Sequence, residues 1–233
     1  KSIVEQCRKT IASHFNVTAG EIIFTSGGTE ADNLALRSAV RDLGVTHFIT
    51  SKIEHHAVLH TLDQLQKEYD IDVSYVNLLQ GGEIDINHLE SLLNTEKKAL
   101  VSLMHVNNEI GNLLDVKAVA KLCKEYNVLF HTDSVQSVGH YAIDLSETPI
   151  DFLAASAHKF HGPKGVGALF IREGVSFNSL IVGGRQERDR RAGTENAAGI
   201  IGLAAALDLA VNGLNTGTSC IESLRNRLEQ QLI

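Results

Sequence analysis

The sequence is poor in cysteine, in long apolar runs and in positive charge. Its three cysteines, Cys7, Cys123 and Cys220, are an odd and widely spaced set, which is typical of a reducing cytoplasm and not of a disulfide framework. No apolar run approaches the roughly 20 residues that a bilayer-spanning helix needs. Residues 1–7 also lack the apolar core of a signal peptide. We therefore expect a cytoplasmic protein with no membrane partner.

The charge balance narrows the possible partners further. The formal net charge is −7, from 21 Lys and Arg against 28 Asp and Glu, which argues against a protein that wraps nucleic acid. Hydrophobic residues make up 43% and charged residues 21%, so the composition is that of a folded globular protein. No CxxC or HExxH spacing occurs, and the adjacent His55 and His56 would point to opposite faces of an extended chain. No metal is therefore predicted.

Short β-branched or apolar runs alternate with amphipathic stretches along most of the chain. The runs predicted as strands are 21–26, 46–51, 72–77, 99–105, 128–133, 152–156 and 166–171. Between most of them, apolar residues recur at helical spacing, as at Val58, Leu62 and Leu65. Repeated β-α-β units predict an α/β fold, with a mostly parallel sheet covered by helices on both faces. Towards the end, an Ala/Leu-rich helix is expected from Thr194 to about Val211, then a break over 212–217 and a last helix to 233.

Polar side chains follow several of the predicted strands, at the sheet edge where such folds bind ligands. The glycine-rich turn 25–30 leads into a helix, and its backbone N–H groups and Thr29 hydroxyl are suited to an anion. The same turn is also compatible with a plain loop capped by Thr29. Asp133, at the end of the run 128–133, could pair with a protonated ring nitrogen or simply cap the next helix.

Three further features could carry chemistry. Lys159 directly follows the apolar run 152–156, where partial desolvation would make its amine a usable nucleophile for a Schiff base; most lysines, however, are solvated surface residues. His55 could lie over an aromatic ring and transfer protons, or it could cap a helix. The arginine-rich segment 185–191 suggests an anionic ligand or partner in an otherwise acidic chain, or a solvated loop with surface ion pairs.

Taken together, a phosphate turn, an acid for a ring nitrogen, a stacking histidine and a Schiff-base lysine are the groups that bind pyridoxal 5′-phosphate. The sequence then strongly resembles the cysteine desulfurases of the class V aminotransferase group, within the fold-type I pyridoxal-phosphate enzymes. The matching blocks occur in family order and cover nearly the whole chain. They are 25–30, 54–59, 104–111, 131–139, 156–165 and 191–196.

The resemblance implies a role for each matching residue. Lys159 would bind the cofactor covalently and then move protons at the substrate α-carbon, Asp133 would pair with the pyridine nitrogen, and His55 would stack on the ring and help in protonation. Thr194 would reach the phosphate of the neighbouring subunit, which implies a homodimer. The remaining implied contacts are Asn108 and Gln136 to the phenolic oxygen of the ring, and Gly28, Thr29, Ser156 and His158 to the phosphate.

The resemblance also implies an activity and a domain organisation. The family converts L-cysteine to L-alanine and an enzyme persulfide, and a sulfur-acceptor protein of iron–sulfur cluster or tRNA-thiolation pathways takes the sulfur. Residues 1–213 would be the large cofactor domain without its amino-terminal segment, and 214–233 would begin the connection to an absent small carboxyl-terminal domain.

The family's nucleophilic cysteine and its substrate-binding arginine follow the large domain, so Cys7, Cys123 and Cys220 receive no catalytic role. Two alternatives stay open. One is another class V pyridoxal-phosphate enzyme, a selenocysteine lyase or an aminotransferase. The other is an inert, truncated cofactor-binding scaffold.

Overall fold

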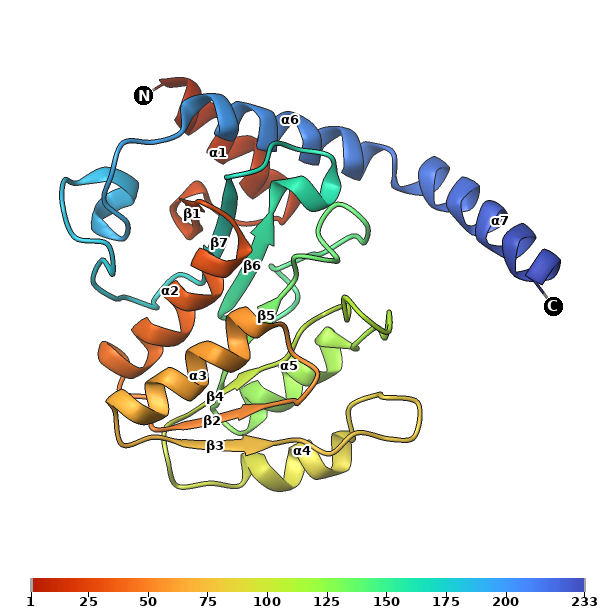
Figure 1. Cartoon of the computed structure of the whole chain (residues 1–233). Helices are drawn as coiled ribbons and strands as arrows, with labels where there is room; N and C mark the ends of the chain where they lie inside the picture. Colours follow the sequence, from red (N-terminus) through yellow and green to blue (C-terminus); the bar gives the residue numbers. More distant parts are fainter. Residues whose placement is uncertain (1, 233) are drawn as a thin grey trace.

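A computed structural model describes residues 2–232, and the side chains of 215–219 lie outside that description. One seven-stranded sheet forms the middle layer of the fold, with helices on either side (Figure 1). Each strand lies within one of the predicted runs, so the predicted α/β fold is confirmed. The strands are β1 (Ile22–Thr25), β2 (His47–Thr50), β3 (Asp72–Tyr75), β4 (Ala99–Ser102), β5 (Leu129–Asp133), β6 (Phe152–Ser156) and β7 (Gly167–Ile171).

The sheet order is β1-β7-β6-β5-β4-β2-β3, and every pairing is parallel except the two that β7 makes. β7 runs antiparallel because residues 157–166 are fewer than the dozen or more that a parallel crossover needs. β1 is antiparallel to β7 and therefore parallel to β5 and β6. The carboxyl ends of β1, β5 and β6 consequently share one edge of the sheet.

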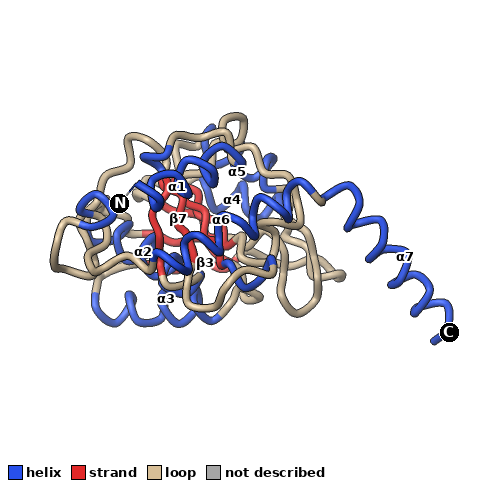
Figure 2. The backbone as a smooth tube through the Cα atoms, turned by 90° about the horizontal axis from the view of Figure 1, so that it is seen from above, coloured by secondary structure: helices blue, strands red, loops and turns tan. Residues whose placement is uncertain are grey.

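Two hydrophobic clusters, one on each face, hold the layers together. Helices α1 (Ser2–His14), α4 (Ile86–Leu93), α5 (Val116–Glu125) and α6 (Ala197–Asn212) pack on one face, whereas α2 (Gly28–Arg41) and α3 (His56–Glu68) pack on the other (Figure 2). Neighbouring strand residues alternate between the clusters, as Leu153 and Ala154 do. Each fully buried Leu, Ile or Phe side chain contributes roughly 1.5–3 kcal/mol.

The outer edge of β1 is covered by an ion pair. Arg8 donates to the carbonyl of Ile22 at 2.8 Å, and the N–H of Phe24 donates to Glu187 at 2.8 Å. Arg8 and Glu187 also pair with each other at 2.6 Å, with both side chains buried. Glu187 lies in a short helix, η3 (Gln186–Asp189), in which Glu187 to Asp189 all have positive φ. Such a backbone costs roughly 1–2 kcal/mol per residue, which the bonds of Glu187 offset.

The carboxyl-terminal helices differ in one respect from the sequence prediction. α6 begins at Ala197, three residues after Thr194, and it is followed directly by α7 (Leu214–Leu232). A break is present where the sequence predicts one, but it is shorter than 212–217: Gly213 alone interrupts the helix, and its φ of −91° and ψ of −2° allow the helix to resume at once.

α7 extends away from the rest of the fold (Figure 1) and exposes one apolar stripe. The stripe consists of Ile221, Leu224, Leu228 and Leu232. Among residues 2–232, the structure contains no helix with the length and apolarity that a membrane crossing requires.

Candidate active site

A cavity of about 320 Å³ opens at the sheet edge where β5 and β6 end, beside the amino end of α2. Its size suits a small-molecule ligand, for which pockets of roughly 300–1,000 Å³ are usual. Nine of the ten residues predicted to contact the cofactor line it, and Thr194 does not. The lining residues are Gly28, Thr29, Asp32, His55, Met104, Asn108, Asp133, Val135, Gln136, Ser156, His158 and Lys159.

One end of the cavity is suited to an anion. The first-turn N–H groups of α2 have no intrahelical acceptor, and the helix dipole favours negative charge there. Gly28 lets the backbone at the start of α2 come close to Val135, because a Cβ at this position would lie 2.4 Å from Cγ2 of Val135. Beside the turn, where a Cβ on Gly27 would lie 3.5 Å from Ser156 Oγ, Ser156 Oγ and His158 Nδ1 are hydrogen-bonded at 2.9 Å. A phosphate group fits this end both in charge and in donors.

Asp133 lines the same cavity, and its side chain also acts as a cap. Its Oδ1 accepts the N–H of Val135 at 2.9 Å, which caps the following turn, while the carboxyl also lines the cavity. Burial, and then the nearby Asp32, raise the pKa of Asp133 to about 7. A cation in the cavity would favour its ionised form. Asp133 is thus placed to pair with a protonated ring nitrogen.

His55 is also both a helix cap and a cavity residue. Its Nδ1 accepts the N–H of Ala57 at 3.0 Å, as the N-cap of α3. Because the amide can only donate, Nδ1 carries no proton, and the proton of the neutral ring is on Nε2. The cap therefore fixes the tautomer and the orientation of a ring that lines the cavity.

Lys159 approaches the cavity from a short helix, η2 (Ala157–Phe160), that follows β6 directly. Its side chain is partly buried, and its carbonyl oxygen is hydrogen-bonded by His140 Nε2 at 3.0 Å. Among the described residues that line the cavity, it is the single lysine. The structure therefore presents one primary amine to whatever binds there.

Sequence reasoning missed Asp32, which lines the cavity behind Asp133. Its side chain is 1% exposed, and burial raises its pKa to about 8. Asp32 lies four residues after Gly28 on α2, so both face the same way. That helical spacing was the available signal.

Asn107 was missed as well, and it joins two loops of the site. Its Nδ2 donates to the carbonyl of Ile53 at 2.7 Å, two residues before His55. Its Oδ1 accepts the N–H groups of Glu109 and Ile110 at 2.8 and 2.9 Å. Asn107 is 4% exposed, and it holds the turn that presents Asn108. One buried amide thus ties both loops together.

Thr194 and the cysteines lie elsewhere. Thr194 lines a second cavity of about 90 Å³ together with Thr25, Ser26 and Arg191, on another side of the glycine turn. Cys7 and Cys123 are buried, and Cys220 is exposed on α7. Residues 2–232 hold no group of three or more His, Cys, Asp or Glu side chains that could bind a metal.

Comparison with known proteins decides the family. The family described as Aminotransferase class-V matches residues 1–233. The chain belongs to this class V aminotransferase family. It is 46% identical over 231 residues to "Cysteine desulfurase IscS" of Clostridium botulinum, covering 98% of this chain and 57% of that protein. It is 47% identical over 214 residues to "Cysteine desulfurase" of Sinorhizobium fredii, covering 91% and 55%.

Solved structures agree with this assignment. A structure titled "NIFS-LIKE PROTEIN" superposes with a TM-score of 0.94 and 39% identity, covering 99% of this chain and 64% of that one. DndA from Streptomyces lividans gives a TM-score of 0.93 and 36% identity, covering 99% and 66%. The chain thus spans a little over half the length of its curated relatives.

Class V aminotransferases and their cysteine desulfurase relatives are pyridoxal-phosphate enzymes, and the residues of this cavity fit that cofactor. Gly28 allows the start of α2 to pack against Val135, where a Cβ would clash, so the first N–H groups of α2 lie at the cavity. Ser156 lies next to this turn, and His158, Asp133 and Lys159 supply an imidazole, a carboxyl and an amine in the same cavity. The cavity thus offers a complementary group for each of the phosphate, the ring nitrogen and the aldehyde of the cofactor.

Proposed function

We propose that this chain is the cofactor domain of a cysteine desulfurase, which converts L-cysteine to L-alanine and an enzyme persulfide for iron–sulfur cluster or tRNA-thiolation pathways. The observation that carries the proposal is that Lys159 and Asp133 line one cavity together with the amino end of α2, Ser156 and His158, which are suited to an anion. The names of the curated relatives support the reaction. A structure titled "SspA in complex with cysteine", 36% identical, supports the substrate.

At the anion end, Gly28, Thr29, Ser156 and His158 hold the phosphate. The α2 N–H groups and the Thr29 and Ser156 hydroxyls are donors, and His158 is oriented by its bond to Ser156. Burial and the neighbouring Lys159 and Lys164 lower the pKa of His158. A bound dianion would counter that shift and favour the charged, donating form.

Asp133 would pair with the pyridine nitrogen and keep it protonated, and Asn108 and Gln136 would donate to the phenolic oxygen. When bound, the cofactor would accept the electron pair released at the substrate α-carbon. His55 would stack on the ring, with its proton on Nε2 because Nδ1 caps α3. Lys159 would hold the cofactor aldehyde, and its amine would move protons at the substrate α-carbon.

The partners follow from the same proposal. Thr194 lies outside the cavity of its own chain, which supports a role at the phosphate of a second copy in a homodimer. A sulfur-acceptor protein takes the persulfide sulfur, and the scarcity of cysteine supports a cytoplasmic location. Residues 1–213 form the large domain and 214–233 begin the connection to a smaller one. The exposed stripe on α7 supports that boundary.

Covalent trapping tests the cofactor site. The chain is incubated with pyridoxal phosphate, reduced with borohydride and mapped by peptide mass spectrometry. We expect the label on Lys159, no label at that site in Lys159→Ala, and an unchanged label in Lys164→Ala. Lys164 is a matched control because it is exposed in the same connection between β6 and β7. An unmodified Lys159 in the presence of excess cofactor would overturn the assignment.

The reaction is tested in a protein with the full length of the relatives. We expect equal amounts of alanine and persulfide sulfur from L-cysteine, and loss of both in Lys159→Ala. Release of selenium from selenocysteine without reaction of cysteine would assign the protein to a selenocysteine lyase instead. Alanine production that survives the replacement of every cysteine would count against the persulfide route.

A further inference from the structure

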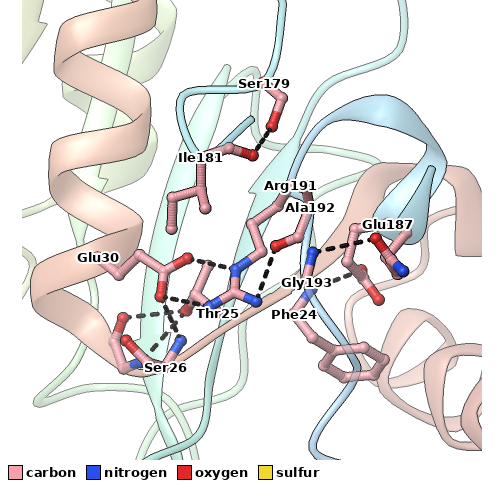
Figure 3. Close-up of polar contacts among 12 residues, drawn as sticks. Phe24, Thr25, Ser26, Glu30, Ser179, Ile181, Glu187, Arg191, Ala192 and Gly193 are labelled. Carbon is pink, nitrogen blue, oxygen red and sulfur yellow. Dashed lines mark hydrogen bonds and ion pairs between the residues drawn. The ribbon is translucent and has the colours of Figure 1, made fainter. Parts of the chain in front are cut away.

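The segment 179–196 carries Thr194, and it is attached to the phosphate turn by an ion pair that no cofactor contact requires (Figure 3). Arg191 Nε donates to Glu30 Oε1 at 2.8 Å, and Nη2 donates to Oε2 at 3.2 Å. The guanidinium and the carboxylate therefore meet side by side in the two-point geometry that is strongest for such pairs. Their side chains are 22% and 16% exposed.

Glu30 makes one more contact, and this contact reaches the turn itself. Its Oε2 accepts the N–H of Ser26 at 2.8 Å, so the carboxylate folds back over the start of its own helix. Burial alone would raise the pKa of Glu30, but Arg191 and the N–H of Ser26 hold it below the ordinary value. The carboxylate is thus charged, and it fixes the residue that precedes Gly27 and Gly28.

Arg191 is itself held in place by its own segment. The N–H of Ala192 donates to the carbonyl of Ile181 at 3.1 Å, and the N–H of Gly193 donates to Gln186 Oε1 at 3.0 Å. Further back, Glu187 attaches the segment to β1 at Phe24. Figure 3 shows these anchors on either side of the Arg191 guanidinium. The segment 179–196, which we call the brace, therefore supports the Ser26–Gly28 turn.

We propose that Arg191 and Glu30 are positioning residues for the cofactor phosphate: together they hold the Ser26–Gly28 turn in the geometry that presents the N–H groups of α2. This inference rests on the proposed function and deepens it. Neither side chain lines the cavity, so the pair acts through the turn. The same pair links the turn, which serves the phosphate site of its own chain, to the segment that carries Thr194 towards the site of the second copy.

Comparing pyridoxal phosphate with pyridoxal tests the idea. Both offer the same ring to Asp133 and the same aldehyde to Lys159, and only the first has a phosphate for the turn. We expect Arg191→Ala to weaken binding of pyridoxal phosphate about tenfold, which corresponds to about 1.4 kcal/mol, and binding of pyridoxal less than about twofold. Glu30→Ala should lose the same affinity for pyridoxal phosphate as Arg191→Ala. The double variant should bind pyridoxal phosphate no more weakly than either single variant.

Arg37→Ala is the matched control. Arg37 lies on the same helix and pairs with Glu68 and Gln64, away from the cavity, so both affinities should stay unchanged. Glu30→Gln keeps an acceptor for Ser26 but loses the charge, and it should fall between wild type and Glu30→Ala. If Arg191→Ala left both affinities unchanged, or lowered them in parallel, the inference would be overturned and the proposed function would stand. A wild-type chain that binds neither ligand would refute the proposed function and the inference with it.

Discussion

Asp32 Oδ1 lies 3.3 Å from His131 Nε2, and neither atom has a hydrogen-bond partner in the described part of the chain. Both side chains are fully buried. Burial raises the pKa of Asp32 to about 8 and lowers the pKa of His131 to about 4. At neutral pH the two groups are therefore an uncharged acid beside an uncharged imidazole, and not an ion pair.

This arrangement predicts how stability depends on pH. A carboxyl whose pKa is raised on folding stabilises the protein at low pH, and this contribution is lost as the pH rises through the folded pKa. Asp32, Glu54 and Asp133 are of this kind, with pKa values of about 8, 8 and 7. The pKa values of His105 and His131 are lowered to about 4, so these two oppose the carboxyls only below about pH 6.5.

We therefore expect the cofactor-free chain to lose stability steadily from pH 6.5 to 8, as urea unfolding would measure. Asp32→Asn imitates the protonated acid, and its advantage in stability over wild type should grow by at least about 1 kcal/mol between pH 5 and pH 8. Asp63→Asn, on the exposed face of α3, is the control. Stability that rises between pH 6.5 and 8 would contradict the assignment of protons.

Asp133→Asn should weaken binding of pyridoxal phosphate tenfold or more, because a charge-assisted bond contributes roughly 1.5–3 kcal/mol. An asparagine oxygen still accepts the N–H of Val135, so the fold should be kept. Equilibrium dialysis measures the affinity, and the exposed Asp63→Asn serves for comparison. Equal affinities in Asp133→Asn and wild type would exclude the pairing with the ring nitrogen.

Asn107 and Asn108 are adjacent, and their replacement by alanine should have opposite consequences. Asn107→Ala removes three partly buried hydrogen bonds of a 4% exposed side chain, to two N–H groups and one carbonyl, so we expect a loss of about 2 kcal/mol in urea unfolding. Asn108 is exposed and lines the cavity. Asn108→Ala should keep the stability and weaken cofactor binding. The opposite pattern would disprove the division of roles.

Glu187→Ala should be among the most damaging single replacements outside the cavity. It removes the acceptor for Phe24 and leaves Arg8 with Glu5 and the carbonyl of Ile22. Breaking a buried pair costs roughly 3–5 kcal/mol, and we expect about 3 because Arg8 keeps these two partners. Glu173→Ala, at an exposed site, should change stability little. A similar small change in Glu187→Ala would mean that the β1 edge is held by other contacts.

Much of the fold could be predicted from the sequence, because β-branched runs and helical spacing are local signals. The direction of β7 could not, because the short 157–166 connection makes β7 antiparallel only when β6 is its neighbour, and the sequence does not show which strands pair. The break over 212–217 was overestimated because asparagine and glycine suggest a turn by composition. In the structure Gly213 stays in the helical region, so a single residue separates α6 from α7.

The candidate site divides in the same way. Lys159, Asp133 and His55 each follow a strand, so their position at the sheet edge was predictable. Asp32 lies within a helix, and Asn107 directly precedes the predicted contact Asn108. Neither residue therefore stands out in the sequence before the sheet and its helices are assembled. The brace made by Arg191 depends on contacts between distant segments, such as the pair with Glu30. Such contacts leave no periodic trace in a sequence.

The sheet order has a consequence for how the chain is made. β1 has one sheet neighbour, β7, in the described part of the chain, so the turn at Gly28 has no fixed place until residues 167–171 have joined the sheet. A chain grows from its amino end during synthesis, and this turn emerges long before its support does. The cofactor can therefore be captured only after synthesis has passed Ile171. Binding of the cofactor therefore follows assembly of the sheet and does not direct it.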